Sequence, residues 1–266
     1  MTRIWGAIVG AAPAGRSTAT VARSAAPAER SAFPTEAPTD EAAWLTFIGG
    51  LPVLDAAVSE RASRAVFVAP HPDDETLGCG GLMTELSARR CAVEVVAVTD
   101  GEGSHPGHGG LAGFRRREQE RALVTLAVGS RPIRLGLPDG HVTDHADRLA
   151  DRLADLTAGA DLVVAPWRAD GHTDHDASGA AAAEATRRSG ARLLEYPVWA
   201  WQWARPDDLA RLAPVRFDLS AGVVARKRAA IGCFASQTTG RLGRVLLPEP
   251  VLARFRRRCE VFVDGR

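Results

Sequence analysis

The sequence predicts an α/β fold: a Rossmann-like, mostly parallel, doubly wound sheet in a single domain, preceded by a disordered N-terminal tail. Three observations lead to this fold class. From residue 65 onward, short apolar runs alternate with helical stretches, which is the pattern of repeated βα units. Apolar residues make up 45% of the 266 residues, so a sizeable core can form. The polar clusters follow expected strands, and in open α/β sheets such loops gather at one edge.

Two short helices are expected at the start of the domain, which we place at residues 39–266. Thr39-Asp40-Glu41 can cap a helix that begins near residue 42 and ends at Gly49-Gly50. A second helix, over about residues 51–60, leads into the first strand.

Strands and helices then alternate. The expected strands, which are short and apolar, are residues 65–69, 91–98, 133–135, 161–165 and 192–195. The expected helices between them begin near residue 77 and then cover residues 114–128, 145–157 and 176–189. After the last of these strands, residues 196–203 carry three Trp at alternate positions, which would line one face of an extended segment. Residues 254–258 are expected to form a solvated basic helix face.

The turn after the first strand is rich in acidic residues and histidine. His71, Asp73, Asp74 and Glu75 lie within five residues, between the strand and the following helix. A solvated turn seldom needs one imidazole and three carboxylates. His71 and Asp74, three residues apart across this turn, can converge on one metal ion.

A second cluster follows the strand at residues 161–165. His172 and His175 are three residues apart at the start of a helix, so either can be a further ligand. With His71 and Asp74 they offer up to three imidazoles and a carboxylate, and catalytic zinc takes three protein ligands and keeps a position for water. The alternative is that these histidines are loop or capping groups.

Both clusters resemble the motifs of a known family. Ala69-Pro70-His71-Pro72-Asp73-Asp74-Glu75 resembles the signature of the LmbE-like, PIG-L family of zinc-dependent N-deacetylases. His172-Thr173-Asp174-His175 resembles the second motif of this family, in which Pro is usual where Thr173 stands. In motif order the resemblance covers about residues 65–240.

The resemblance implies a role for each motif residue. His71, Asp74 and His175 would be the Zn²⁺ ligands, and Asp73 would be the general base. His172 would then stabilise the oxyanion or protonate the leaving nitrogen.

Five further residues are candidates for substrate binding. Arg115 and Asp139 match family positions that contact the substrate, although a surface charge and a turn aspartate are the alternatives. Asp100 can support the site or cap the end of a strand. Trp199 and Trp201 can wall a pocket for a sugar face or an acyl chain, and core packing is expected for at least one of the three Trp.

The expected function is hydrolysis of an amide on a small molecule. Zinc lowers the pKa of bound water to about 7, so an activated nucleophile is available at neutral pH. The resemblance implies removal of an acetyl or other acyl group from the nitrogen of an N-acetylglucosaminide-type amino sugar, such as a secondary-metabolite or thiol-pathway glycoside. An amidase of a larger thiol or glycoside conjugate is the alternative. A nucleotide-binding α/β domain is a weaker one, because neither a Gly-x-Gly-x-x-Gly motif nor a P-loop is present.

Composition excludes other classes of partner. The formal net charge of +1 gives no reason to expect nucleic acid or an anionic membrane surface as a partner. The four cysteines form no Cys-x-x-Cys pair, which favours a reduced, cytoplasmic protein. No stretch reads as a membrane span, and the apolar run near the N-terminus is short for a signal peptide. Residues 1–38, rich in Ala, Ser, Thr, Pro and Arg, are the expected disordered tail.

Overall fold

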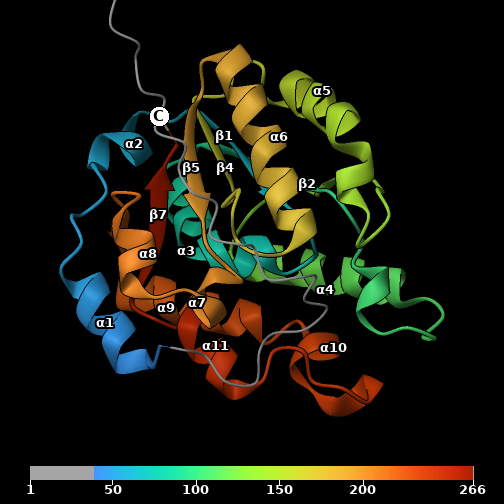
Figure 1. The fold of residues 1–266 in the computed structure, drawn as a ribbon. Helices are drawn as coiled ribbons and strands as arrows, with labels where there is room; N and C mark the ends of the chain where they lie inside the picture. Colours follow the sequence, from blue (N-terminus) through green and yellow to red (C-terminus); the bar gives the residue numbers. More distant parts are fainter. Residues whose placement is uncertain (1–38, 266) are drawn as a thin grey trace, which may run out of the picture.

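A seven-stranded sheet forms the centre of the computed structural model, which describes residues 39–265 (Figure 1). The predicted tail, residues 1–38, lies outside the described residues. The strand order is β3-β2-β1-β4-β5-β7-β6. Strand β7 pairs antiparallel with β5 and β6, and the other pairs are parallel. The strands are β1 Arg64–Ala69, β2 Ala92–Ala97, β3 Ile133–Arg134, β4 Leu162–Pro166, β5 Arg192–Tyr196, β6 Val215–Asp218 and β7 Cys259–Asp264. The predicted mostly parallel α/β sheet is confirmed, whereas β6 and β7 were not predicted.

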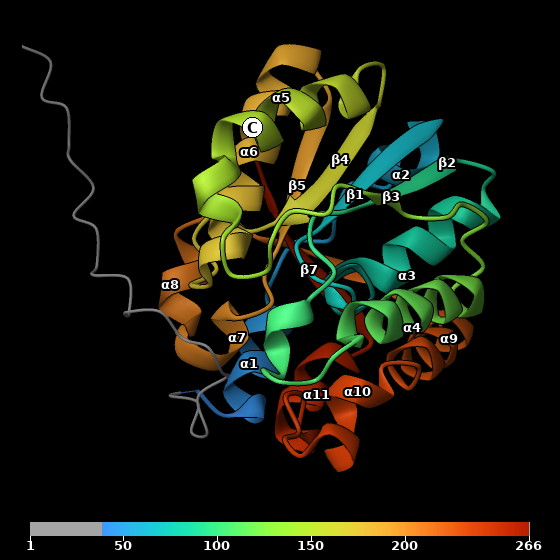
Figure 2. The same cartoon turned by 90° about the vertical axis from the view of Figure 1, so that its right-hand side faces the viewer.

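Helices cover both faces of the sheet (Figure 2). The α-helices are α1 Glu41–Gly49, α2 Ala56–Arg61, α3 Asp74–Ala88, α4 Leu111–Thr125, α5 Ala146–Thr157, α6 Thr173–Ser189, α7 Ala200–Trp203, α8 Pro206–Ala210, α9 Ala221–Ile231, α10 Ala235–Thr238 and α11 Glu249–Phe255. Short 3₁₀ turns are η1 Glu102–Ser104, η2 Val142–His145 and η3 Gly240–Leu242. Among the described residues no helix is both long and apolar enough to cross a membrane.

Strand β1 explains why both faces are covered. Its side chains alternate, so that Phe67 packs into the core shared by α3, α4 and α9. Val66 and Val68 pack on the opposite face, against α5 and α6. Both faces of this strand are therefore apolar, as expected for a parallel strand in the middle of a doubly wound sheet.

Helix α3 is kinked just after the first motif. Cys79 has a non-helical backbone, with φ −144° and ψ 20°. The freed N–H groups of Gly81 and Leu82 donate to the Glu260 carboxylate at 2.6 and 2.9 Å. Lys227 Nζ donates to the same carboxylate at 2.6 Å, deep in the protein. Glu260 thus satisfies two backbone N–H groups at the kink, and through Lys227 it connects α3 to α9 and β7.

The prediction that residues 196–203 form an extended segment is wrong. Its second half is the short helix α7, Ala200–Trp203, because the carboxylate of Asp170 accepts the N–H groups of residues 198–200 and turns the chain into a helix. The three Trp side chains consequently do not line one face.

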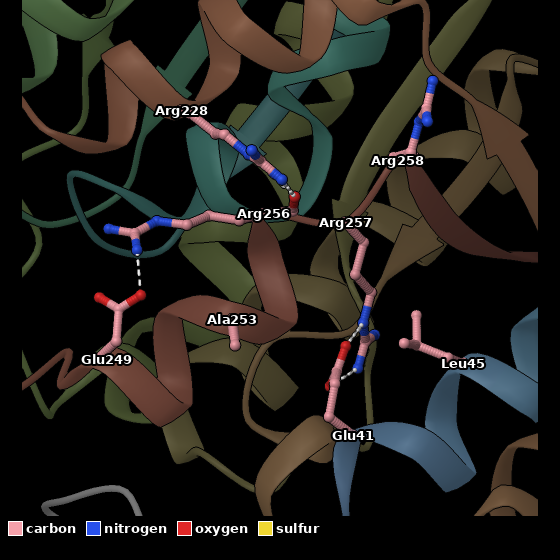
Figure 3. Close-up of a pocket in the computed structure, with 8 residues that line it drawn as sticks. All are labelled: Glu41, Leu45, Arg228, Glu249, Ala253, Arg256, Arg257 and Arg258. Carbon is pink, nitrogen blue, oxygen red and sulfur yellow. Dashed lines mark hydrogen bonds and ion pairs between the residues drawn. The ribbon is translucent and has the colours of Figure 1, made fainter.

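The prediction that residues 254–258 form a solvated basic helix face is also wrong. Helix α11 ends at Phe255, and the guanidinium groups of Arg254 and Arg257 are buried against Glu41 of α1. Figure 3 shows the surface groove at this place, with the Arg257–Glu41 pair and, beside it, the pair between Arg256 and Glu249. The cost of removing these two guanidinium groups from water is offset by their pairing with the Glu41 carboxylate. The local sequence does not reveal this pairing.

Candidate active site

The two motifs meet at the carboxyl ends of β1 and β4. These strands pair in parallel, with Phe67 opposite Val164, so the loops that follow them leave the same edge side by side. From β1 the chain continues to β2 on one side, whereas β4 lies on the other side. This is the point where strand order reverses, and ligands of open α/β sheets bind in the crevice outside it.

Three side chains converge there with one ligand atom each. His71 Nδ1 lies 3.1 Å from Asp74 Oδ2, His175 Nε2 lies 3.2 Å from the same oxygen, and the two ring nitrogens are 3.3 Å apart. All three residues are buried. They form a candidate metal site, because two imidazoles and a carboxylate present lone pairs to one point.

A second group, His71, His172 and Asp174, is also close enough to hold a metal ion. Three of its acceptor atoms already accept backbone N–H groups, however, whereas in the first group only Asp74 Oδ2 does, from His71. Asp174 accepts the N–H groups of Gly140 and Val142 at 2.7 and 3.1 Å, and its own N–H donates to His172 Nδ1 at 3.2 Å. The first group is therefore the better candidate site.

The ionisation of these groups follows from their burial and their neighbours. Burial lowers the pKa of His175, but the carboxylates of Asp74 and Asp170 together raise it to about 9. Burial raises the pKa of Asp74, and the two histidines more than reverse this effect and hold it well below its ordinary range. A divalent cation must therefore displace protons from the imidazoles when it binds.

Asp73 lies next to this cluster at the start of α3. Its φ of 153° and ψ of −28° are rare for a residue other than glycine, and such strain is often found at functional sites. Its Oδ2 accepts a hydrogen bond from Arg115 Nη2 at 3.0 Å. Burial raises the pKa of Asp73 to about 7, although Arg115 opposes the shift. A carboxylate with this pKa is half ionised at neutral pH.

His172 precedes α6 and faces the same cluster. Its ring centroid lies 4.9 Å from that of His71 and 5.1 Å from that of His175. Burial and the charge of these two histidines lower the pKa of His172 to about 3. Because its Nδ1 accepts the Asp174 N–H, the neutral ring carries its proton on Nε2 and can donate from there.

Two acidic residues were missed by sequence reasoning. Asp170 is fully buried, and its Oδ2 lies 2.9 Å from His175 Nδ1. Asp174 Oδ2 lies 3.3 Å from His71 Nε2. Each carboxylate thus faces the ring nitrogen opposite the one in the cluster. Their position in and just before the second motif was the one signal that could have indicated them.

Arg115 and Asp139, both predicted to bind substrate, lie at the cluster. The side chain of Arg115 is buried and donates to the backbone of residues 72 and 101 as well as to Asp73, so the surface-charge alternative is wrong. Asp139 Oδ1 lies 3.1 Å from His71 Nε2, and its Oδ2 accepts the N–H of Gly103 at 2.8 Å.

The other three candidates differ in their surroundings. Asp100 is bound by the guanidinium groups of Arg116 and Arg134. The ring of Trp199 lies 4.9 Å from that of His172, whereas Trp201 packs in the core against Trp44 and Arg257. Trp199 is thus the tryptophan of this pair that borders the cluster.

The sequence of this region is that of a known family. Residues 66–186, which contain both motifs, match the family of GlcNAc-PI de-N-acetylases, PIG-L. This region of the chain belongs to the PIG-L family. The match spans β1 through most of α6, and therefore every residue of the candidate metal site. Thr173, which replaces the usual Pro of the second motif, is the first residue of α6 and has no place in the cluster.

PIG-L relatives from bacteria match less than half of this chain. The 2'-N-acetylparomamine deacetylase of Streptomyces fradiae is 29% identical over 139 residues, 43% of this chain and 49% of that protein. The 1D-myo-inositol 2-acetamido-2-deoxy-alpha-D-glucopyranoside deacetylase of Mycobacterium sp. (strain KMS) is 36% identical over 128 residues, 41% of this chain and 40% of that protein. The chain therefore matches half or less of the length of these relatives.

A solved structure shares the fold over a larger part of the chain. The conserved protein TT1542 from Thermus thermophilus superimposes with a TM-score of 0.57 and 28% identity, over 75% of this chain and 93% of that protein. The similarity to this structure thus extends beyond the family motifs, to most of the described fold.

Proposed function

We propose that this protein is a zinc-dependent N-deacetylase that removes an acetyl or other acyl group from the nitrogen of an N-acetylglucosaminide-type amino sugar. The observation that carries the proposal is the cluster of His71, Asp74 and His175 with Asp73 and His172 beside it. We assign this activity to the proposed domain, residues 39–266.

The cluster fits zinc in its geometry and in its chemistry. Tetrahedral zinc with bonds of about 2.0–2.1 Å separates neighbouring ligand atoms by about 3.3–3.4 Å. The separations among the His71, Asp74 and His175 ligand atoms are 3.1, 3.2 and 3.3 Å. Two imidazoles and one carboxylate leave a fourth position for water or substrate, as in catalytic zinc sites. Bound there, zinc would polarise the substrate carbonyl and make water acidic enough to attack.

Asp73 is the proposed general base. It adjoins a ligand in sequence, and its pKa of about 7 suits proton transfer near neutral pH. Arg115 donates to Oδ2 of this carboxylate and so fixes its position. The other oxygen, Oδ1, receives no hydrogen bond from Arg115. Asp73 accepts a proton from the attacking water. The same proton is then available for the nitrogen that leaves as the amine when the C–N bond breaks.

His172 is proposed to stabilise the oxyanion. With Nδ1 occupied by the Asp174 N–H, its Nε2–H is the group that can donate to a developing negative charge. The lowered pKa of His172 favours this neutral role over that of a charged acid. Of the two roles implied by the family resemblance, oxyanion stabilisation is therefore the one we propose.

The proposed substrate class rests on the names of the relatives and on the residues that border the metal cluster. The names of the two relatives describe deacetylases, one of them acting on a 2-acetamido-2-deoxy-glucopyranoside. Asp139 borders the cluster at His71, and Trp199 borders it at His172. A carboxylate can accept hydrogen bonds from sugar hydroxyls, and an aromatic face can pack on a sugar ring. We propose these two residues as substrate contacts.

The experiment that tests this function is a substrate screen. Zinc-loaded protein is incubated with N-acetylglucosaminides that carry different aglycones, and release of the free amine is followed by mass spectrometry. We expect at least one glucosaminide to lose its acetyl group, with the rate abolished by a chelator. Zinc-loaded protein that releases amine from none of them would contradict the proposed function.

A further inference from the structure

We propose that Asp170 is a positioning residue that holds His175 in the orientation and tautomer needed to bind metal, and that it connects this ligand to the wall of the site at Trp199. The inference rests on the proposed function, because it concerns the same metal site. It assigns a role to a buried carboxylate that lies outside the ligand set.

Asp170 lies in the loop between β4 and α6 and is inaccessible to solvent. Its Oδ1 accepts the N–H groups of Val198 and Ala200 at 3.0 and 2.9 Å. Its Oδ2 accepts the N–H of Trp199 at 2.9 Å and lies 2.9 Å from His175 Nδ1. The carboxylate thus accepts three backbone hydrogen bonds and forms an ion-pair contact with the ring of His175.

The contact with Asp170 decides which nitrogen of His175 is free. A carboxylate is an acceptor only, so the His175 nitrogen beside it, Nδ1, must carry a hydrogen. The lone pair of the metal-free imidazole base is then on Nε2, which lies 3.2 Å from Asp74 Oδ2 and 3.3 Å from His71 Nδ1. A carboxylate behind a ligating histidine fixes the ring and its tautomer in this way.

The same residue also fixes the wall of the site. Because its carboxylate binds three consecutive N–H groups, Asp170 holds Trp199, whose ring lies 4.9 Å from that of His172. Its carbonyl oxygen accepts a hydrogen bond from Trp203 Nε1 at 2.6 Å. One buried side chain thereby connects a metal ligand to the segment that packs on the proposed oxyanion-stabilising histidine.

The variant Asp170→Asn tests the tautomer argument. If the amide oxygen replaces Oδ1, the NH₂ group points at the Trp199 N–H and at His175 Nδ1. The histidine can then avoid a clash of two donors by moving its proton to Nε2, where the metal should bind. We expect the affinity for Zn²⁺, measured by competition with a chelator, to fall about 10- to 100-fold.

Two control variants separate this role from a structural one. Asp176→Asn makes the same substitution six residues later, where the carboxylate accepts the Gly171 N–H instead of facing a metal ligand's ring nitrogen. Trp203→Phe removes the bond to the Asp170 carbonyl and leaves the carboxylate intact. Both should bind Zn²⁺ as tightly as the wild type. Equal zinc affinity of Asp170→Asn and wild type would overturn the inference.

A second measurement keeps the inference testable if Asp170→Asn does not fold. In a crystal structure of the zinc-loaded wild type, His175 should coordinate through Nε2, with Nδ1 within hydrogen-bond distance of Asp170. Coordination through Nδ1, or a wild type without zinc affinity, would overturn it. A protein that binds zinc in this geometry but deacetylates no amino sugar would contradict the proposed function alone.

Discussion

Asp73 combines three properties at one residue: a strained backbone, a buried carboxylate and an arginine partner. Asp73→Asn removes the base and keeps an oxygen that can accept the Arg115 bond. The variant should therefore fold and bind metal, and its kcat should fall by about 10²- to 10⁴-fold. Metal content and kcat, measured on the same preparation, check this. Undiminished kcat would remove Asp73 from the mechanism.

The pH dependence of the rate provides a matching control. Burial raises the pKa of Asp73 to about 7, and a base must be ionised to accept a proton. The rate of the wild type should therefore fall as the pH decreases through about 7, and this acidic limb should be absent from the residual activity of Asp73→Asn. An identical limb in both proteins would assign the ionisation to another group.

His172 and His175 are expected to respond differently to truncation. His175 is fully buried between Asp74 and Asp170, so His175→Ala should lose zinc, and excess zinc should restore part of it. His172 contacts the cluster through its ring, so His172→Ala should keep zinc and lose about 10²-fold in kcat. Side-by-side measurements of metal content and kcat test both. The reverse pattern, with zinc lost only from His172→Ala, would exchange the two roles.

At the scale of elements, the kink of α3 depends on a buried ion pair. Lys227 of α9 neutralises Glu260 of β7, which in turn accepts the N–H groups freed at Gly81 and Leu82. Lys227→Ala leaves a buried carboxylate without its counter-charge, which costs about 3–5 kcal/mol. Urea unfolding should show this loss in the free energy of unfolding. Arg226→Ala, at an exposed neighbouring position, should change it by less than about 0.5 kcal/mol.

The βα units were predictable because they are determined by local patterns. Strands β1 and β4 are apolar on both faces, and the observed bounds differ from the predicted ones by one residue. Strand β7 follows a run of arginines that suggested a solvated helix, and the burial of Arg254 and Arg257 in that run depends on Glu41, more than 200 residues earlier. Helix α7 likewise depends on Asp170, a residue of another loop. Local periodicity does not contain such pairings.

The candidate site, like the fold, was predictable only where local sequence determines it. The strand-end positions of His71, Asp74 and His175 follow from the sequence, and these side chains do lie together. Asp170 and Asp174 were missed because their contacts are made across loops. Trp201 was a candidate wall of the pocket from its spacing, but the turn into α7 directs it into the core against Trp44. Which side chains support a site is therefore decided by tertiary contacts.

At the scale of the whole molecule, the sheet order explains why one metal site can connect distant parts of the chain. The candidate ligands come from two loops on neighbouring central strands, β1 and β4, and more than 100 residues separate them in the chain. A metal ion bound at His71, Asp74 and His175 would join these loops and bind only to the folded chain. Binding to the native state alone raises the free energy of unfolding.

The last prediction follows from this coupling. At a free zinc concentration of about 100 times Kd, the native state should gain about 2.7 kcal/mol, so the Tm should be higher with zinc than with a chelator. Burial lowers the pKa of His175 and its two carboxylate neighbours raise it to about 9, so protons compete with zinc below that pH. The difference in Tm should therefore shrink as the pH decreases. His175→Ala should show little difference at any pH, whereas Asp73→Asn should behave as the wild type. A wild-type Tm that is the same with zinc and with chelator would show that the three side chains do not hold the metal.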